Sequence, residues 1–298
     1  MKKLLVLTLT LLLCFSFVAC ELLDDSPTPI GDLSSSSSKP AGGGEGGEGE
    51  GGEGESASNG LRFSLLSDGT YQVMNIGTFT GDELVIPDTY DGEKVTAIKS
   101  NAFQGNTTIK SVTLGANITT VGDYAFMGCS AIEEIALNEG LVQIGKSAFY
   151  ECSALTSLEL PEGLETIGEN AFKNCSKIDT IVFNKDLVTI DSYAFSNCTS
   201  LTSIKLPASL ELVNDSAFLG CSSLAEIKIT NGVQILGGAV FHGCPITSIT
   251  IPVSVKMVGW GVFRNCGSLT TIICGAESKP GGWDLNWNYG CNAEVIWG

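Results

Sequence analysis

Residues 155–177 read LTSLELPEGLETIGENAFKNCSK, and the rest of the chain repeats this pattern. The phenylalanine near its end recurs eight times, first at spacings of 23 residues and finally of 22. The eight residues are Phe103, Phe126, Phe149, Phe172, Phe195, Phe218, Phe241 and Phe263. Eight copies at one period of this length are typical of a solenoid, in which identical turns of chain stack on one another.

The copy at 201–224 shows how each turn is expected to fold. Leu201, Ile204 and Leu206 are apolar at the spacing of a short strand, and Pro207 ends it. A second apolar set follows between 210 and 218. One turn cannot bury both sets alone, so neighbouring turns must close the core between them. Parallel strands of successive turns should then lie about 4.7–4.9 Å apart.

The unit at 155–177 resembles the BspA-like leucine-rich repeat, and the resemblance covers about 83–298. It implies a mostly β, right-handed leucine-rich-repeat coil of about eight 23-residue units, with a parallel sheet and N- and C-terminal caps. Proteins of that family are mostly surface-exposed or secreted, and some are adhesins for host matrix proteins. The resemblance implies no catalytic activity and no cofactor.

Composition divides the repeat region into three parts. Residues 60–94 predict an N-terminal cap with a β-hairpin, because Asp68-Gly69 separates two alternating apolar runs. Residues 95–273 hold the leucine-rich repeats. Residues 274–298 predict a C-terminal cap, and all four tryptophans fall at or after position 260. We expect the tryptophans to cover the open end of the core, since solenoids need caps.

The first 59 residues predict a lipoprotein leader and a tether. Lys2 and Lys3 precede an apolar run that ends at Phe17-Val18-Ala19-Cys20, so residues 1–19 resemble a lipoprotein signal peptide with lipidation at Cys20. An ordinary secretory signal is the alternative. Residues 20–59 are rich in serine, glycine and glutamate, carry a net charge of −8, and predict a disordered tether. We therefore expect a lipid-anchored protein of the bacterial cell envelope that is exposed at the surface.

The overall composition excludes several classes of function. The chain has 33 acidic and 16 basic residues, a net charge of −17, which argues against nucleic-acid binding. Its single histidine, His242, excludes a metal site with several histidines and leaves a Ser-His-Asp triad one candidate. His242 directly follows a repeat phenylalanine, at a phase where side chains vary widely, so we expect this phase to be exposed and the residue not to be catalytic.

Seven cysteines stand three residues after successive phenylalanines, and Asn106 takes this place in the first repeat. Stacked turns would place these thiols in one row with parallel side chains, which suits neither disulfides nor a tetrahedral zinc site. We expect buried free thiols there, and a side chain at Asn106 that bonds a turn. Cys274 and Cys291 are outside this phase; a disulfide between them is one expectation, and unpaired thiols are the alternative.

The outward side of the first strand of each turn is the candidate binding surface. It is rich in serine and threonine, and its notable members form a strip of eight residues: Glu134, Ser157, Glu159, Thr180, Ser203, Lys205, Glu226 and Lys228. Tyr124, Tyr193 and Trp260, each directly before Ala or Gly, are expected to share another phase and offer a second face. Solvated strand positions are the alternative for the strip, because binding hot spots favour Trp, Tyr and Arg.

Two functions remain open from the sequence. The first is an adhesin-like surface lipoprotein that presents a monomeric solenoid to an extracellular protein or polysaccharide, with host matrix proteins among the candidates. The second is a structural or accessory envelope protein without a dedicated ligand. The long tether favours the first function, and the plain composition of the strip favours the second.

Overall fold

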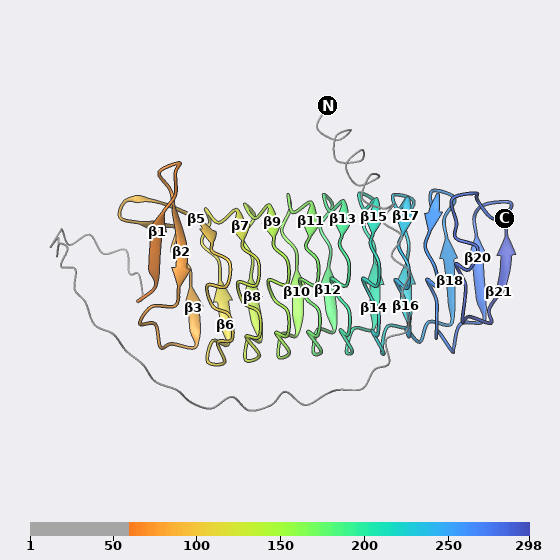
Figure 1. Ribbon diagram of the computed structural model, residues 1–298, viewed down its shortest axis with the longest axis horizontal. Coiled ribbons are helices and arrows are strands. Elements are labelled where there is room, and N and C mark those ends of the chain that lie inside the picture. Colours follow the sequence, from red (N-terminus) through yellow and green to blue (C-terminus); the bar gives the residue numbers. More distant parts are fainter. Residues whose placement is uncertain (1–59) are drawn as a thin grey trace, which may run out of the picture. The chain divides into compact units, whose positions relative to one another are not determined.

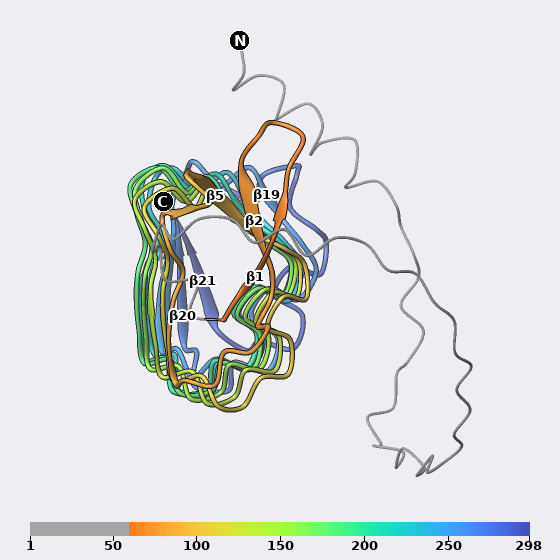
Figure 2. The ribbon, with the colours of Figure 1, turned by 90° about the vertical axis from the view of Figure 1, so that its left-hand side faces the viewer.

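The computed structural model describes residues 60–298, and within them every regular element is a β-strand. The predicted signal peptide (1–19), the tether (20–59) and the lipidation site Cys20 lie outside the described residues and stay predictions. Successive turns of the chain stack side by side along the long axis of Figure 1. Seen along the stack, the turns superimpose on one closed outline (Figure 2). The chain is therefore a parallel solenoid, as the repeat predicts.

One side of the solenoid carries a continuous eleven-stranded sheet with the order β1-β2-β5-β7-β9-β11-β13-β15-β17-β19, where β4 pairs with β5. Its strands are β1 (Arg62–Leu65), β2 (Tyr71–Asn75), β4 (Thr89–Tyr90), β5 (Glu93–Ile98), β7 (Thr120–Val121), β9 (Gln143–Ile144), β11 (Thr166–Ile167), β13 (Thr189–Ile190), β15 (Leu212–Val213), β17 (Ile235–Leu236) and β19 (Met257–Val258). The strands from β7 onward have two residues each and pair in parallel. The sequence indicated only an apolar set here, not a sheet.

The opposite side carries the strands that the sequence predicts, one from each turn. They are β3 (Glu83–Val85), β6 (Ser111–Thr113), β8 (Glu134–Ala136), β10 (Ser157–Glu159), β12 (Thr180–Val182), β14 (Ser203–Lys205), β16 (Glu226–Lys228), β18 (Ser248–Ile251), β20 (Thr271–Cys274) and β21 (Glu294–Trp297). They form four short parallel sheets, and neighbouring strands of different sheets are in contact. Ten such strands in residues 60–298 mean about ten turns, because the two caps continue the stack beyond the expected eight repeats.

The eight repeat phenylalanines form one stack through the centre of the core. Each ring is at most 2% exposed. Neighbouring ring centroids lie 4.9–5.9 Å apart with the rings nearly parallel. Leu201, Ile204 and Leu206 are also buried, as the strand pattern predicts. Stacked, offset aromatic pairs add to the free energy gained from burial alone, so this row couples each turn to the next.

The seven repeat cysteines form a second row, and all are buried free thiols as expected. Each thiol donates a hydrogen bond to the carbonyl of the phenylalanine one turn earlier; Cys175, for example, lies 3.1 Å from the Phe149 oxygen. Burial raises the pKa of the Cys129 thiol to about 11 and that of Cys221 to about 12. Asn106 also bonds a turn as predicted, because its Oδ1 accepts from the backbone N–H of Thr108 and Ile109.

Both ends of the stack carry distinct structures. At the N-terminal end β1 and β2 form an antiparallel hairpin around the turn at Asp68, and it projects beyond the common outline in Figure 2. At the C-terminal end Trp283 and Trp287 are buried, and Trp297 packs against both. Trp260 differs, because it is 39% exposed. Three of the four tryptophans therefore cover the end of the core, and Trp260 is a surface residue.

Candidate functional site

All eight residues of the strip are exposed on the outward side of β8, β10, β12, β14 and β16. Strand pairing brings several of them side by side: Ser157 lies opposite Thr180, Ser203 opposite Glu226, and Lys205 opposite Lys228. The strip is thus a continuous surface across five successive turns, as the alternation of the strands predicts.

A shallow hollow of about 480 Å³ lies over β12, β14 and β16, the C-terminal half of the strip. Its lining includes Thr180, Ser203, Lys205, Glu226 and Lys228. Within residues 60–298 neither lysine takes part in an ion pair, so both ammonium groups are available to a partner. The hollow therefore offers hydroxyls and charges of both signs to a partner.

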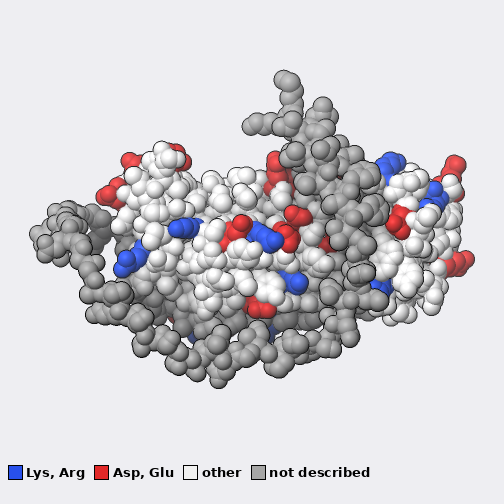
Figure 3. Space-filling model, viewed as in Figure 1, with Lys and Arg blue, Asp and Glu red and all other residues white. Residues whose placement is uncertain are grey.

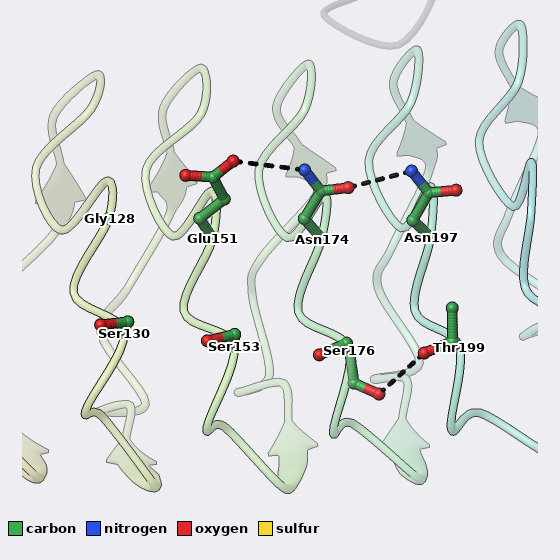
Figure 4. Close-up of a pocket in the computed structure, with 8 residues that line it drawn as sticks. All are labelled: Gly128, Ser130, Glu151, Ser153, Asn174, Ser176, Asn197 and Thr199. Atoms are coloured by element: carbon green, nitrogen blue, oxygen red, sulfur yellow. Dashed lines mark hydrogen bonds between the residues drawn. The ribbon is translucent and has the colours of Figure 1, made fainter. Parts of the chain in front are cut away.

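A second groove, of about 530 Å³, runs along another edge of the solenoid (Figure 4). One wall is a ladder in which Asn197 donates to Asn174 (3.0 Å) and Asn174 donates to Glu151 (3.5 Å). The other wall carries the hydroxyl groups of Ser130, Ser153, Ser176 and Thr199. The polar side chains of this ladder bond one another across successive turns. Their placement therefore follows from the stacking of the turns and does not require a ligand.

The prediction that Tyr124, Tyr193 and Trp260 share one phase is wrong for Trp260. The carbonyl of Trp260 accepts from Ala239 N–H, whereas the carbonyl at the same place one turn earlier belongs to Gly238. Tyr124 and Tyr193 instead occupy the next position, where φ is near +60°, and Gly261 holds that position in the last repeat. Trp260 therefore lies one residue out of phase with the tyrosines. It stacks on Tyr289 from the C-terminal cap, with ring centroids 5.2 Å apart.

The expectation of an exposed phase at His242 is also wrong in part. His242 is half-buried, and Ser196 at the same phase is fully buried. Burial, together with the nearby Arg264 cation, lowers the pKa of His242. Its Nε2 lies 3.0 Å from the Asn265 amide nitrogen, one turn later.

The two cysteines outside the predicted row are free thiols in the structure. Cys274 is buried at the end of β20, next to Trp297 of β21. Cys291 is half-buried, and its N–H bonds the carbonyl three residues earlier, as in each cysteine of the row. Burial is the main cause of the raised pKa of Cys266, and the charge of Cys291 contributes to the same shift. The disulfide between Cys274 and Cys291 stays a prediction.

Charge and metal-binding groups are dispersed over the described residues. Figure 3 shows basic and acidic side chains scattered over one face between large uncharged areas. Within residues 60–298, no group of three or more His, Cys, Asp or Glu residues is placed to hold a metal ion. No segment of the described residues forms a helix that could span a membrane.

Stacked parallel turns with inward leucine and isoleucine rows define a leucine-rich-repeat solenoid. A family profile described as BspA type leucine rich repeat region (6 copies) matches residues 82–202 and 188–279. The chain belongs to this family, as the sequence resemblance indicated. The repeat is typically non-enzymatic, and its solenoids generally serve as scaffolds for protein interaction.

Solved structures of bacterial leucine-rich-repeat proteins share the fold. A protein from Bacteroides ovatus is 26% identical, with 80% of this chain and 70% of that chain covered and a TM-score of 0.58. The T. pallidum leucine-rich-repeat protein is 29% identical, with 64% and 89% covered and a TM-score of 0.60. Among curated proteins, none matches the chain significantly.

Proposed function

We propose that this chain is a non-enzymatic, adhesin-like lipoprotein of the bacterial cell surface that binds an extracellular protein or polysaccharide through the strip. The observation that carries the proposal is the continuous exposure of the eight strip residues across five adjacent strands. A row of this kind suits an extended or repetitive partner, because each turn offers a similar small contact. Many weak contacts to one polymer add up to a high overall affinity.

The hollow around Lys205 and Lys228 is the proposed centre of the strip. The two ammonium groups belong to adjacent strands and have Glu226 beside them. A partner with carboxylate or sulfate groups and hydroxyls at regular intervals would pair with the lysines and bond Ser203 and Thr180. Host matrix proteins and their glycans carry such groups and are candidates.

The anchor is proposed from the sequence of the leader. Cys20 would carry the lipid, and residues 20–59 would hold the solenoid about 35 Å from the membrane if they behave as a flexible chain. The protein would then act as a monomer at the cell envelope. Replacement of Cys20 by alanine should release the full chain into the soluble fraction. Continued sedimentation with membranes would contradict lipidation at Cys20.

The binding proposal is tested with the full-length protein on arrays of matrix proteins and oligosaccharides. We expect saturable binding to at least one polymer, and weaker binding to short fragments of it than to the whole polymer. The second candidate, a structural or accessory envelope protein, is favoured by the absence of Trp, Tyr and Arg from the strip. If no arrayed molecule binds saturably, the adhesin proposal fails and the structural function stands.

A further inference from the structure

A cluster of side chains on the last two turns lies apart from the strip. The guanidinium carbon of Arg264 lies 5.2 Å from the centre of the Trp260 ring and 6.0 Å from that of Tyr289. Trp260 and Tyr289 are surface residues, 39% and 54% exposed. The whole sequence has only two arginines, so the placement of one against two exposed aromatic rings is unusual for this chain.

The backbone of the cap makes this cluster continuous. Asp284 N–H bonds the Val258 carbonyl and Gly261 N–H bonds the Asn286 carbonyl, so residues 284–286 run beside 258–261. This alignment places the backbone of Leu285, which is 86% exposed, alongside residues 258–261. We call Trp260, Arg264, Leu285 and Tyr289 the cap patch.

The guanidinium group of the cap patch has no ion-pair or hydrogen-bond partner among the described residues. Arg264 forms no ion pair within residues 60–298, and its guanidinium group donates none of the hydrogen bonds found there. The aliphatic part of the Arg264 side chain lies close to two glycines. A Cβ atom added at Gly261 would lie 3.5 Å from it, and one added at Gly290 would lie 3.0 Å from it. An otherwise acidic protein therefore holds a guanidinium group with five free donors at a fixed place on its surface.

The chemistry of the cap patch favours a protein partner over a sugar. Trp260 and Tyr289 stack on each other and Arg264 lies over the Trp260 ring, so the aromatic surface here is combined with a cation. The exposed Leu285 adds an aliphatic contact. Trp, Tyr and Arg are the residue types that dominate the binding energy of protein interfaces, and charge complementarity requires an acidic partner.

We infer that the cap patch is a docking surface for a protein partner that places an Asp or Glu carboxylate on Arg264 and an adjacent apolar side chain against Trp260, Tyr289 and Leu285. The carboxylate accepts two hydrogen bonds from the planar guanidinium group. This surface is separate from the strip, so it does not depend on the function proposed above.

The test uses the full-length protein and a displayed library of random peptides, selected in parallel on the wild type and on Arg264→Ala. On the wild type we expect enrichment of sequences with Asp or Glu next to an aromatic or aliphatic residue. A synthetic peptide from the selection should bind at least tenfold more weakly to Arg264→Ala and to Trp260→Ala, because truncated hot-spot residues have effects of this size. Arg264→Lys should be intermediate, since it keeps the charge and loses the planar fork.

The chain offers two matched controls. Lys173 lies 4.9 Å from the centre of the Tyr193 ring, so Tyr193→Ala removes a similar cation–π pair elsewhere and should not change peptide affinity. The double variant Lys205→Ala/Lys228→Ala should also bind the peptide normally, which separates this surface from the strip. The inference is overturned if no peptide is enriched, if the enriched peptides lack carboxylates, or if they bind Arg264→Ala equally well. It is also overturned if Arg264→Ala abolishes binding to acidic oligosaccharides on an array and leaves peptide binding intact.

Discussion

The replacement of Phe172 by alanine tests how far the phenylalanine stack couples the turns. Phe172 is fully buried in the middle of the array, with ring centroids 5.2 Å from Phe149 and 5.5 Å from Phe195. Truncation of a buried phenylalanine costs about 3–5 kcal/mol, and each lost aromatic pair adds about 0.5–1.5 kcal/mol where it is well packed. We therefore expect a loss at the upper end, about 5 kcal/mol in the free energy of unfolding.

The assay is urea unfolding of the full-length protein, followed by far-UV circular dichroism and by tryptophan fluorescence. The two probes report on different parts, because all four tryptophans lie at or after position 260. Two variants serve as controls. Phe172→Leu keeps most of the volume and should lose less than half as much. Phe103→Ala removes a ring with one stacked neighbour, Phe126 at 4.9 Å, and should lose less than Phe172→Ala.

A loss below about 1 kcal/mol at Phe172 would mean that the turns do not depend on a filled central row, contrary to the structure of the phenylalanine stack. Equal losses for Phe103→Ala and Phe172→Ala would show that the core is filled but that stacking between turns adds nothing.

Three further predictions concern the polar and thiol groups of the core. Asn184→Ala should cost about 2–3 kcal/mol in urea unfolding, because its buried amide donates to the Pro161 and Leu164 carbonyls at 2.7 and 3.0 Å; a loss below about 0.5 kcal/mol would contradict this. Iodoacetamide at pH 8.5 should modify Cys291 but not Cys175 in the native protein, since of these two thiols only Cys291 is partly exposed. Mass spectrometry of the two cysteine peptides measures the extent of labelling, and rapid labelling of native Cys175 would show that the cysteine row is open to solvent. Burial raises the pKa of the Cys129 thiol to about 11, above the value of about 8.5 in the unfolded chain. The stabilisation from the buried neutral thiol is therefore complete below about pH 8.5 and is lost as the pH rises toward 11. Thermal unfolding of Cys129→Ala should therefore change less between pH 8 and pH 11 than that of the wild type, and an identical change in both would contradict the account.

The rows of the core could be predicted from the sequence because each row repeats at one period. Phe172, Cys175 and Leu158 recur in phase, so stacking follows from counting residues. The continuous sheet could not be predicted in this way. Its strands from β7 onward have two residues, such as Thr166–Ile167, and two residues are too few to show an alternation of apolar and polar side chains.

Of the two candidate surfaces, the strip could be predicted from the repeat period and the cap patch could not. Exposure of Lys205 and Lys228 follows from the alternation in β14 and β16. The contact of Arg264 with Tyr289 could not be predicted from the repeat, because Tyr289 lies in the C-terminal cap, where the repeat period no longer applies. The phase of Trp260 can be read from the sequence, because Trp260 stands three residues before Phe263, whereas Tyr124 and Tyr193 stand two residues before the phenylalanine of their repeat.

The most direct test of the binding account is the affinity of the full-length protein for its best arrayed ligand, before and after charge reversal at the centre of the strip. The double variant Lys205→Glu/Lys228→Glu changes two exposed side chains and should keep the same circular dichroism spectrum and melting temperature. We predict that its affinity falls at least tenfold and that the loss shrinks at high salt, because salt screens exposed charges. Unchanged affinity in this variant would contradict the claim that the strip is the binding surface.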